Sequence, residues 1–555
     1  MRPIVLVLSG AIAVGKSTLA AGLAELGFYS VKSTALMRRA LDTKSSPPTP
    51  AFVHRETLQA VGDELDAATN GAWLAQHLHL YLTGNPQRLL LVDAARTANQ
   101  IAHIRKLYGA CVVHVHLAAP VEKLAQRYFS RAGQAADGTY GAFSTHNATE
   151  ANVGKLAHIA DVVIDTTNCT ADDVLVRVAG HLGLFGRGTE KLVDVLVGGF
   201  WGSEGKGQVS AYLAPEYDVL VRVGGPNAGH KVWEGGEQKS YTFYHLPSGT
   251  RSTNAQIILG AGSVIGLAKL LEEVADCGLT PDRLSVDPNA VIIDNADIAM
   301  ERTLGSAVAT IGSTGQGVGA ATARKALRTM AESQFGLANR MAKNEPALQP
   351  FIRDTVGLLE RHYAHGRRIF LEGTQGTHLS LHHGSFPHVT SRDTTVQGTL
   401  ADAGIPASRV RKSIIVCRSY PIRVQSPDES MQGVDGATSG PMGQEITWQE
   451  IAERSGYEVQ GLTKSEMTST TKRRRRVAEF SWPAFRRSVT LNGPTDVALT
   501  FADYYGKENS EARRYEQLND QARRQIEEME RVGGAPVSLV AVRFRHRSII
   551  DRRSW

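Results

Sequence analysis

The stretch Gly199–Gly207, with the sequence GFWGSEGKG, follows the apolar run Leu192–Val197 and opens the longer part of the chain. An apolar strand that passes through a glycine-rich turn into a helix presents backbone N–H groups to a phosphate. A second loop of this kind, Gly10–Ser17 (GAIAVGKS), follows the apolar run Ile4–Leu8 and fits the pattern G-x-x-x-x-G-K-[ST]. Two such loops, far apart along the chain, predict two fused enzymes of nucleotide chemistry.

The composition narrows the class of protein. A length of 555 residues allows several domains, and 42% hydrophobic with 21% charged residues is typical of a soluble globular protein. No apolar run approaches the roughly 20 residues that span a membrane, so we expect no membrane partner. The four cysteines lack CxxC or metal-ligand spacing, which favours a reduced, cytoplasmic protein.

The net charge of +6 indicates anionic partners, either small molecules such as nucleotides and aspartate or a nucleic acid. The strongest basic cluster is Lys472–Arg476, and its flanking sequence fits a substrate loop better than a nucleic-acid site. Small-molecule substrates are therefore the favoured interpretation.

Strand and helix signals alternate through residues 1–185, which predicts an α/β domain with a parallel sheet wrapped by helices. We expect strands at Ile4–Leu8, Leu89–Asp93, Cys111–Leu117 and Ala160–Asp165, and helices at Ser17–Glu25 and Arg55–Ala68. Residues 186–190 are the predicted linker. A second α/β domain, residues 191–555, restarts with a strand, a phosphate loop and a helix. Near its end the highly charged stretch Lys507–Arg531 predicts a solvated helix.

The first phosphate loop has residue types suited to binding a nucleoside triphosphate. Gly10 and Gly15 let the backbone wrap the phosphates, and Lys16 neutralises the β- and γ-phosphate oxygens. Ser17, followed by Thr18 at the start of the predicted helix, supplies a hydroxyl to Mg²⁺.

Two further segments, Arg55–Leu65 and Val92–Arg96, resemble the small nucleotide kinases that include phage deoxynucleoside-monophosphate kinases and dephospho-coenzyme A kinases. The resemblance implies phosphorylation of a (deoxy)nucleoside monophosphate, whose identity stays open. It implies that Asp93 binds a Mg²⁺-bound water or the acceptor, and that Arg55 and Arg96 hold the acceptor phosphate.

Arg127 and Arg131 lie four residues apart on a predicted helix. They are candidates for a lid that stabilises the transferring phosphoryl group. A surface salt bridge is the alternative for each of these arginines.

Six motifs of the second domain occur in the order found in the adenylosuccinate synthetase family, which residues 191–555 resemble along nearly their whole length. They are Trp201–Gly207 (WGSEGKG), Gly224–His230 (GGPNAGH), Ile311–Gly319 (IGSTGQGVG), Glu372–Gly376 (EGTQG), Phe386–Ser391 (FPHVTS) and Thr470–Arg476 (TTKRRRR). That family joins L-aspartate to C6 of a purine nucleotide. A nucleoside triphosphate phosphorylates O6, and the aspartate amine then displaces phosphate. The chemistry needs a base at N1, an acid near O6, and cations for carboxylates and phosphates.

The resemblance assigns roles by position. Among the catalytic positions, Ser203 stands at the position of the base and His230 at that of the general acid. Lys206 matches the phosphate-binding lysine, and Asn227 matches the contact to O6. Donor contacts fall on Gly202, Glu204, Gly205, Gly207, Phe501 and Asp503. Substrate contacts fall on Thr314, Gln375 and Thr390 for the nucleotide and on Thr470, Thr471, Arg473 and Arg475 for the aspartate carboxylates, which suit bidentate guanidinium pairing. Arg328 matches an arginine supplied across a subunit interface, which implies a homodimer, and Gly229 matches a Mg²⁺ ligand.

Three positions depart from the family pattern. Ser203 stands in place of the catalytic aspartate and is not a base at neutral pH, but its small hydroxyl can accept a hydrogen bond from a purine 2-amino group. Phe501 replaces the lysine of the guanine-recognition motif, although Asp503 remains. Ala541–Phe544 replaces a segment beside the donor base.

These departures resemble the phage 2-aminoadenylosuccinate synthetases, which use dGMP, aspartate and ATP. We therefore predict a bifunctional enzyme that uses Mg²⁺ and prefers ATP, in the host cytoplasm if the chain is phage-encoded. One alternative is an ordinary adenylosuccinate synthetase that acts on IMP with another base. A second alternative is a non-catalytic nucleotide sensor. The preference for ribose or deoxyribose and any cooperation between the domains stay open.

Overall fold

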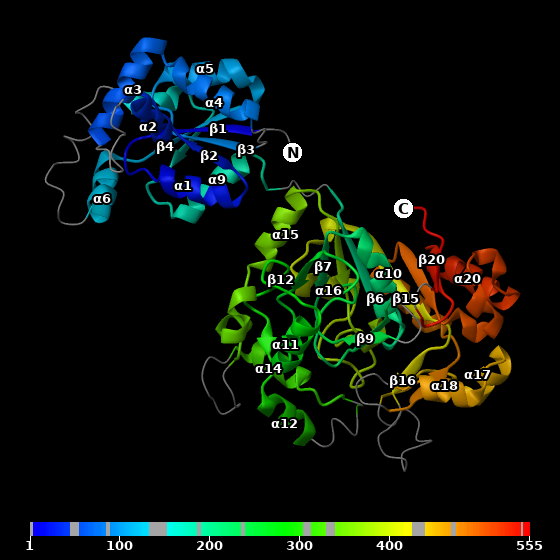
Figure 1. The fold of residues 1–555 in the computed structure, drawn as a ribbon. Coiled ribbons are helices and arrows are strands. Elements are labelled where there is room, and N and C mark those ends of the chain that lie inside the picture. Colours follow the sequence, from blue (N-terminus) through cyan, green and yellow to red (C-terminus); the bar gives the residue numbers. More distant parts are fainter. Residues whose placement is uncertain are drawn as a thin grey trace. The chain divides into compact units, whose positions relative to one another are not determined.

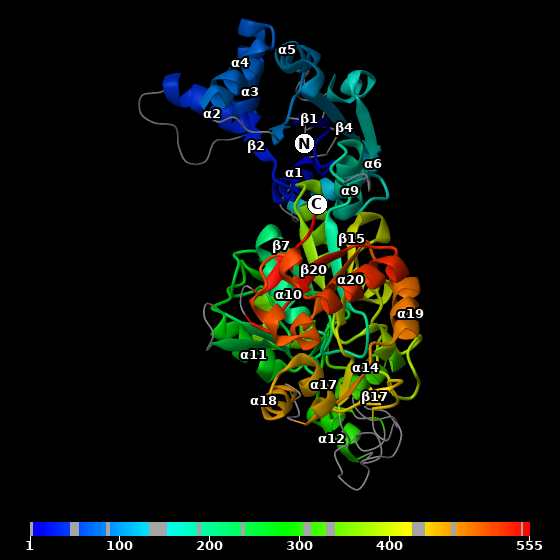
Figure 2. The ribbon, with the colours of Figure 1, turned by 90° about the vertical axis from the view of Figure 1, so that its right-hand side faces the viewer.

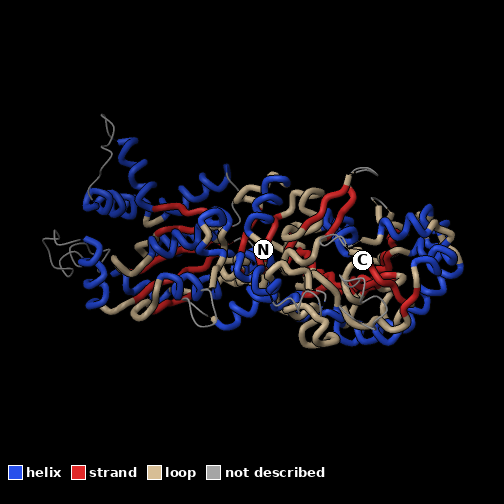
Figure 3. The backbone as a smooth tube through the Cα atoms, turned by 90° about the horizontal axis from the view of Figure 1, so that it is seen from below, coloured by secondary structure: helices blue, strands red, loops and turns tan. Residues whose placement is uncertain are grey.

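The computed structural model describes residues 4–44, 55–84, 89–132, 152–185, 190–234, 239–303, 311, 313–328, 339–424, 439–467, 473–545 and 548–555. Its contacts divide the chain into two compact units, Met1–Arg187 and Gly188–Trp555. Strands lie inside each unit and helices outside, which confirms the predicted α/β class (Figure 1, Figure 3). Within these ranges, no helix is both long and apolar enough to cross a membrane.

The smaller unit contains one parallel sheet in the order β2-β3-β1-β4-β5. Its strands are β1 (Ile4–Gly10), β2 (Tyr29–Lys32), β3 (Leu89–Asp93), β4 (Val112–Ala118) and β5 (Val162–Asp165). Its helices are α1 (Lys16–Glu25), α2 (Ser33–Lys44), α3 (Arg55–Thr69), α4 (Ala72–Gly84), α5 (Ala98–Tyr108), α6 (Val121–Ala132) and α9 (Ala171–His181). The four predicted strands are confirmed within two residues, and β2 is additional.

Strand β1 is central because both of its faces are apolar. Leu6 and Leu8 pack with α1 and α9 on one face, whereas Val5 and Val7 pack with residues of α4 and α5 on the other. Side chains alternate across a strand, so a continuous apolar run is buried on both sides. This burial fixes the position of the phosphate loop that follows β1.

The larger unit is built on a nine-stranded sheet in the order β12-β10-β7-β14-β6-β15-β19-β20-β21. All its neighbours are parallel except β20 and β21. Its strands are β6 (Val193–Gly198), β7 (Val219–Arg222), β10 (Gln256–Leu259), β12 (Leu284–Val286), β14 (Ile369–Glu372), β15 (Val410–Arg418), β19 (Asp496–Thr500), β20 (Val537–Ala541) and β21 (Ile549–Asp551). The small pairings are β8 (His230–Trp233) with β9 (Ser240–Phe243), β11 (Val264–Ile265) with β13 (Val291–Ile292), and β18 (Arg475–Ala478) between β16 (Ile422–Val424) and β17 (Glu445–Ile446).

The helices of this unit cover both faces of the sheet or pack beside it. They are α10 (Lys206–Leu213), α11 (Leu267–Asp276), α12 (Asn295–Thr303), α14 (Val318–Leu327), α15 (Thr355–Ala364), α16 (Val396–Ala403), α17 (Trp448–Ser455), α18 (Val459–Ser465), α19 (Trp482–Asn492) and α20 (Asp520–Gly533). Residues of α16, α19 and α20 join one hydrophobic core, and residues of α10 and α11 join the other. Helices α19 and α20 lie side by side, as Figure 2 shows.

The prediction of one solvated helix over Lys507–Arg531 was wrong. The stretch begins with short 3₁₀ turns at Lys507–Glu511 and Tyr515–Gln517, and α20 begins only at Asp520. The side chain of Asn519 accepts a hydrogen bond from the Ala522 N–H at 2.9 Å and so caps the helix there. The helix also buries one apolar face in the core, because charged residues occupy only its outer side.

Candidate active site

Loops that follow the carboxyl ends of β6, β14, β19 and β20 line a cavity of about 1620 Å³ in the larger unit. Parallel sheets place ligands at this edge because the connections that leave the strands meet there. The position agrees with the phosphate loop predicted after β6.

Most of the predicted site residues of this unit line the cavity. They are Gly202, Ser203, Gly205, Lys206, Gly207, Asn227, Gly229, His230, Thr314, Gln375, Thr390, Arg473, Arg475, Phe501 and Asp503. Two others lie elsewhere: Glu204 is buried under the phosphate loop, and Arg328 is exposed at the C-terminal end of α14. Thr470 and Thr471 lie outside the described residues.

Glu204 shapes the phosphate loop from inside. Its Oε1 accepts hydrogen bonds from the N–H groups of Phe200 at 3.2 Å and Gly202 at 2.7 Å. Its Oε2 accepts from Lys206 Nζ at 2.6 Å. The carboxylate thus holds the turn closed and gives the buried lysine a counter-ion. A triphosphate that binds the loop competes with Glu204 for the lysine charge.

Ser203 occupies the left-handed backbone region, with a φ of 57°, and lines the cavity. Few residues other than glycine adopt this conformation, and aspartate and asparagine do so more readily than serine.

Gly207 is required by close packing between α10 and β8. A Cβ atom there would lie 2.8 Å from the Cβ of His230, so only glycine lets α10 approach β8 this closely.

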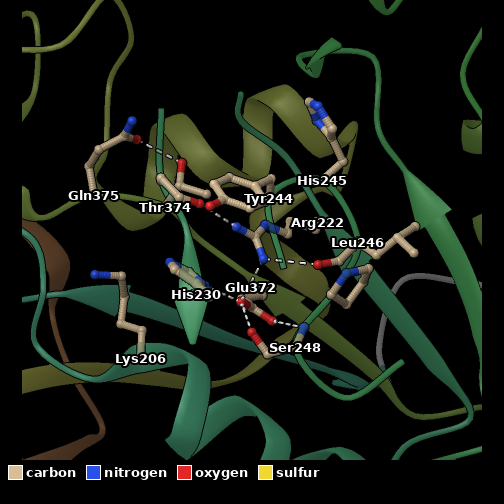
Figure 4. Close-up of polar contacts among 12 residues, drawn as sticks. Lys206, Arg222, His230, Tyr244, His245, Leu246, Ser248, Glu372, Thr374 and Gln375 are labelled. Carbon is tan, nitrogen blue, oxygen red and sulfur yellow. Dashed lines mark hydrogen bonds and ion pairs between the residues drawn. The ribbon is translucent and has the colours of Figure 1, made fainter. Parts of the chain in front are cut away.

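His230 begins β8 and is held by Glu372 at the end of β14. Its Nδ1 hydrogen-bonds the Glu372 carboxylate, which also accepts from Ser248 Oγ at 2.6 Å and from the Ser248 N–H at 2.8 Å. Arg222, the register partner of Glu372 on the neighbouring strand β7, donates to the same carboxylate at 3.3 Å. Figure 4 shows Glu372 between these three side chains.

The protonation of this group follows from its environment. Burial, and next the charge of Arg222, lowers the pKa of His230 to about 4. Burial alone would raise the pKa of Glu372, but the Arg222 charge and the hydrogen bond from His230 outweigh it and lower that pKa to about 2. An ionised carboxylate can only accept, so Nδ1 carries the hydrogen of the neutral imidazole. Nε2 is therefore the atom left for a ligand.

Another part of the cavity wall is aromatic and acidic. The rings of Phe501 and Phe544 are nearly parallel, with centroids 5.8 Å apart. The Oδ2 of buried Asp503 accepts from the Tyr457 hydroxyl at 3.0 Å, whereas Oδ1 has no hydrogen-bond partner among the described residues. Burial raises the pKa of Asp503 to about 7, against the lowering effect of the Tyr457 hydrogen bond. This wall offers an aromatic surface beside an unused buried acceptor.

Sequence reasoning missed the residues that hold the catalytic candidates in place. Glu372 belongs to a motif that was recognised, yet it received no role. Arg222 and Ser248 gave no local signal. Arg222 meets Glu372 through the register of two neighbouring strands, and Ser248 lies 124 residues from Glu372 in the sequence. Glu466, which binds Arg475, was likewise unassigned.

The phosphate loop of the smaller unit follows β1 as predicted. Gly15, with a φ of 105°, precedes α1, and Lys16 Nζ donates to the carbonyls of Gly10 at 2.6 Å and Ala11 at 2.8 Å. Ser17 and Thr18 are exposed in the first turn of α1.

The other candidates of this unit come from β3, the segment after it, α3 and α6. Asp93 ends β3 beside Leu8 of β1, and Arg96 follows it. Arg127 on α6 donates to the Thr166 hydroxyl at 2.9 Å and to the Thr166 carbonyl at 2.5 Å. The side chains of Arg55 and Arg131 lie outside the described residues.

Replacement of Asp503 by asparagine should stabilise the larger unit in a pH-dependent manner. The unfolded carboxyl ionises near 3.8, whereas the folded one keeps its proton up to about 7. The stability contributed by that proton is therefore lost as the pH rises between these values. We expect Asp503→Asn to raise the free energy of unfolding at pH 8 by at most about 4 kcal/mol, and by less at pH 5.5. Urea unfolding at both pH values measures the difference.

The matched control is Asp520→Asn at the exposed start of α20, which should show no such pH dependence. A gain for Asp503→Asn that is equal at both pH values, or no gain at pH 8, would contradict the prediction.

Comparison with known proteins agrees with this geometry. The family model described as Adenylosuccinate synthetase matches residues 195–335 and 330–510. The adenylosuccinate synthetase of Pyrococcus horikoshii is 35% identical over 365 residues, which are 65% of this chain and 98% of that protein. The structure of fully ligated adenylosuccinate synthetase from Plasmodium falciparum matches with a TM-score of 0.56 at 20% identity, over 65% of this chain and 100% of that one. At this identity the likeness supports the fold alone.

A second solved structure, the cyanophage S-2L succinoaminodeoxyadenylate synthetase, matches with a TM-score of 0.53 at 28% identity, over 66% of this chain and 96% of that one. The resemblance inferred from the six motifs is confirmed, and the chain belongs to the adenylosuccinate synthetase family.

Proposed function

We propose that residues 191–555 join the amine of L-aspartate to C6 of dGMP, with ATP as the phosphoryl donor. The observation that carries the proposal is Ser203, a non-basic residue that lines the cavity at the family's base position. The cyanophage S-2L relative was solved with dGMP and with dATP as an energy donor, which supports the same substrate class.

The serine favours a purine with a 2-amino group through its size and chemistry. A carboxylate at this position would be crowded and desolvated by the exocyclic amine, whereas a hydroxyl accepts a hydrogen bond from it. A hydroxyl is not a base at neutral pH, so the N1 proton, which IMP and dGMP both carry, must pass to another acceptor. The substitution therefore bears on the acceptance of the 2-amino group of dGMP.

The remaining groups supply charge and orientation. Lys206 neutralises the donor phosphates, and the Nδ2 of Asn227 donates to O6. His230 presents Nε2 to the cavity, while Glu372 holds its Nδ1–H. Because the pKa of His230 is low in the free protein, it must take up a proton as phosphate negative charge enters before it can act as an acid. The guanidinium groups of Arg473 and Arg475 grip the aspartate carboxylates.

The loop before β8 has oxygen atoms that fit Mg²⁺. Asn227 Oδ1 is buried without a hydrogen-bond partner in the described residues, and Gly229 lines the cavity two residues later. Carbonyl oxygens together with substrate phosphates form typical Mg²⁺ sites. When bound, the ion neutralises charge on the transferring phosphoryl group. In the smaller unit, the hydroxyl of Ser17 would bind the Mg²⁺ ion of that unit's phosphate loop.

Two features support ATP rather than GTP as donor. Phe501 replaces a charged lysine with an aromatic surface, and Arg543 and Phe544 rebuild the neighbouring segment. Asp503 offers its unused acceptor to the exocyclic amine of adenine or to guanine, so the preference rests on Phe501 and on the Arg543–Phe544 replacement. The exposed Arg328, which does not line the cavity of its own chain, supports a homodimer in which it reaches the partner's site.

We propose that residues 1–185 phosphorylate a (deoxy)nucleoside monophosphate. The support is a complete phosphate loop, Gly10 to Ser17, between a central parallel strand and a helix, with Asp93 at the end of the adjacent strand. Residues 186–190 are the proposed linker between two independently active domains.

The test is a turnover assay that offers dGMP or IMP, ATP or GTP, with L-aspartate and Mg²⁺. We expect aspartate-dependent phosphate release with dGMP and ATP, and a kcat/KM at least tenfold lower with GTP. Turnover of IMP alone would instead establish an ordinary adenylosuccinate synthetase. Nucleotide binding without any turnover would establish a sensor.

Ser203→Asp should weaken the use of dGMP by at least tenfold in kcat/KM and restore some IMP turnover, because it introduces a base and crowds the 2-amino group. Ser203→Ala is the matched control, which removes the hydrogen bond without adding a charge. It should lose less dGMP activity and gain no IMP activity. Equal use of dGMP by Ser203→Asp and the parent would show that this residue does not select the substrate.

Lys16→Ala should abolish nucleoside-monophosphate kinase activity and leave C–N bond formation near the parent rate. Lys206→Ala should do the reverse, because each lysine serves one phosphate loop. Both activities are measured in the full chain with purified substrates. Loss of synthetase turnover in Lys16→Ala would mean that the two domains are coupled.

A further inference from the structure

Glu466 is a buried carboxylate in the wall of the cavity, at the C-terminal end of α18. It accepts hydrogen bonds from Arg418, from Arg475 Nη1 at 2.9 Å and from the Tyr504 hydroxyl at 2.7 Å. Its side chain is 2% exposed, so these partners replace its contact with water. Three elements distant in sequence, β15, β18 and the turn after β19, therefore meet on one carboxylate.

The partners of Glu466 lead to two different substrates. Arg418 lies over the ring of Phe501 at 3.8 Å from its centroid, on the wall proposed for the donor base. Arg475 begins β18, directly after the loop proposed to grip L-aspartate, and lines the cavity. An unbroken chain of contacts thus runs from Phe501 through Arg418, Glu466 and Arg475.

The positive charges in this series of contacts outnumber the negative charges. Two guanidinium groups, of which Arg418 is 1% exposed and Arg475 14% exposed, share the single carboxylate of Glu466. The cluster keeps a net positive charge on the side of Arg475, which is the more exposed of the two and engages Glu466 through Nη1. A guanidinium fork can bind one carboxylate with one edge and offer its other edge to a second. The arrangement suits an anion that enters from the cavity.

We propose that Glu466 is a positioning residue, which orients Arg475 toward a carboxylate of L-aspartate and links it to the donor-base wall at Phe501. The inference rests on the proposed function of residues 191–555. It predicts that a change at Glu466 weakens aspartate binding selectively, because dGMP is held by other residues of the cavity. It also predicts that the aspartate KM depends on which donor base, adenine or guanine, contacts the wall.

The test is steady-state kinetics of the full chain with dGMP, ATP and L-aspartate. Glu466→Gln retains the shape of the side chain and removes its charge. We expect its aspartate KM to rise at least tenfold, with the dGMP KM within twofold of the parent. In the parent the aspartate KM should differ between ATP and GTP, and this difference should disappear in the variant.

Glu466→Gln leaves the buried guanidinium of Arg418 and the partly buried one of Arg475 without a counter-ion and can fail to fold. Glu466→Asp then decides the question, because it keeps the charge but retracts the carboxylate by one methylene. Its thermal unfolding should stay close to that of the parent, while its aspartate KM still rises severalfold and its dGMP KM does not.

Asp194 of β6 provides the matched control. It is fully buried and accepts hydrogen bonds from the Tyr217 hydroxyl at 2.6 Å and from Arg411 Nε at 2.9 Å, but it does not line the cavity. Asp194→Asn should lower the unfolding temperature without a selective rise in the aspartate KM.

Two results would overturn the proposal for Glu466. One is an aspartate KM within twofold of the parent in a folded variant. The other is a parallel rise of both KM values, as for a general structural defect. If the parent itself shows no aspartate-dependent turnover of dGMP, the proposed function has failed instead.

Discussion

The larger unit depends on one buried carboxylate, Glu372. It ends a central strand and is bonded by Arg222 on the next strand, by Ser248 and by His230. Removing a charge of this kind from water is costly, and several donors must compensate it. The same bonds that keep Glu372 ionised hold the imidazole of His230 in one orientation and one tautomer. Core stability and the geometry of the site therefore have a common origin.

The lysines of the two phosphate loops donate hydrogen bonds to different groups within their loops. Lys16 rests against backbone carbonyls of its own loop, whereas Lys206 rests against the carboxylate of Glu204. The ion pair between Lys206 and Glu204 holds the second loop closed. A shared motif of glycines and lysine does not by itself reveal this difference.

Sequence reasoning predicted the α/β class and the strands around each loop, because apolar runs such as Ile4–Leu8 are local signals of burial. It also placed Ser203, Lys206, Asn227 and His230 in one site, since the residues and the order of the six motifs carried the family resemblance. It did not predict β2, whose sequence YSVK contains one buried position, or the interrupted helix before Asp520. Such features depend on neighbouring strands and on a single capping side chain.

The sequence by itself determined which residues are chemically able to act: a serine where a base is expected, two lysines on glycine-rich loops, and paired arginines for carboxylates. Only the tertiary structure decided which groups support them. Parallel strand register sets Glu372 opposite Arg222, and the fold brings Glu466 between Arg418 and Arg475. The reason is physical: motifs act through local backbone geometry, whereas the burial and pairing of a charge depend on segments that meet only when the chain is folded.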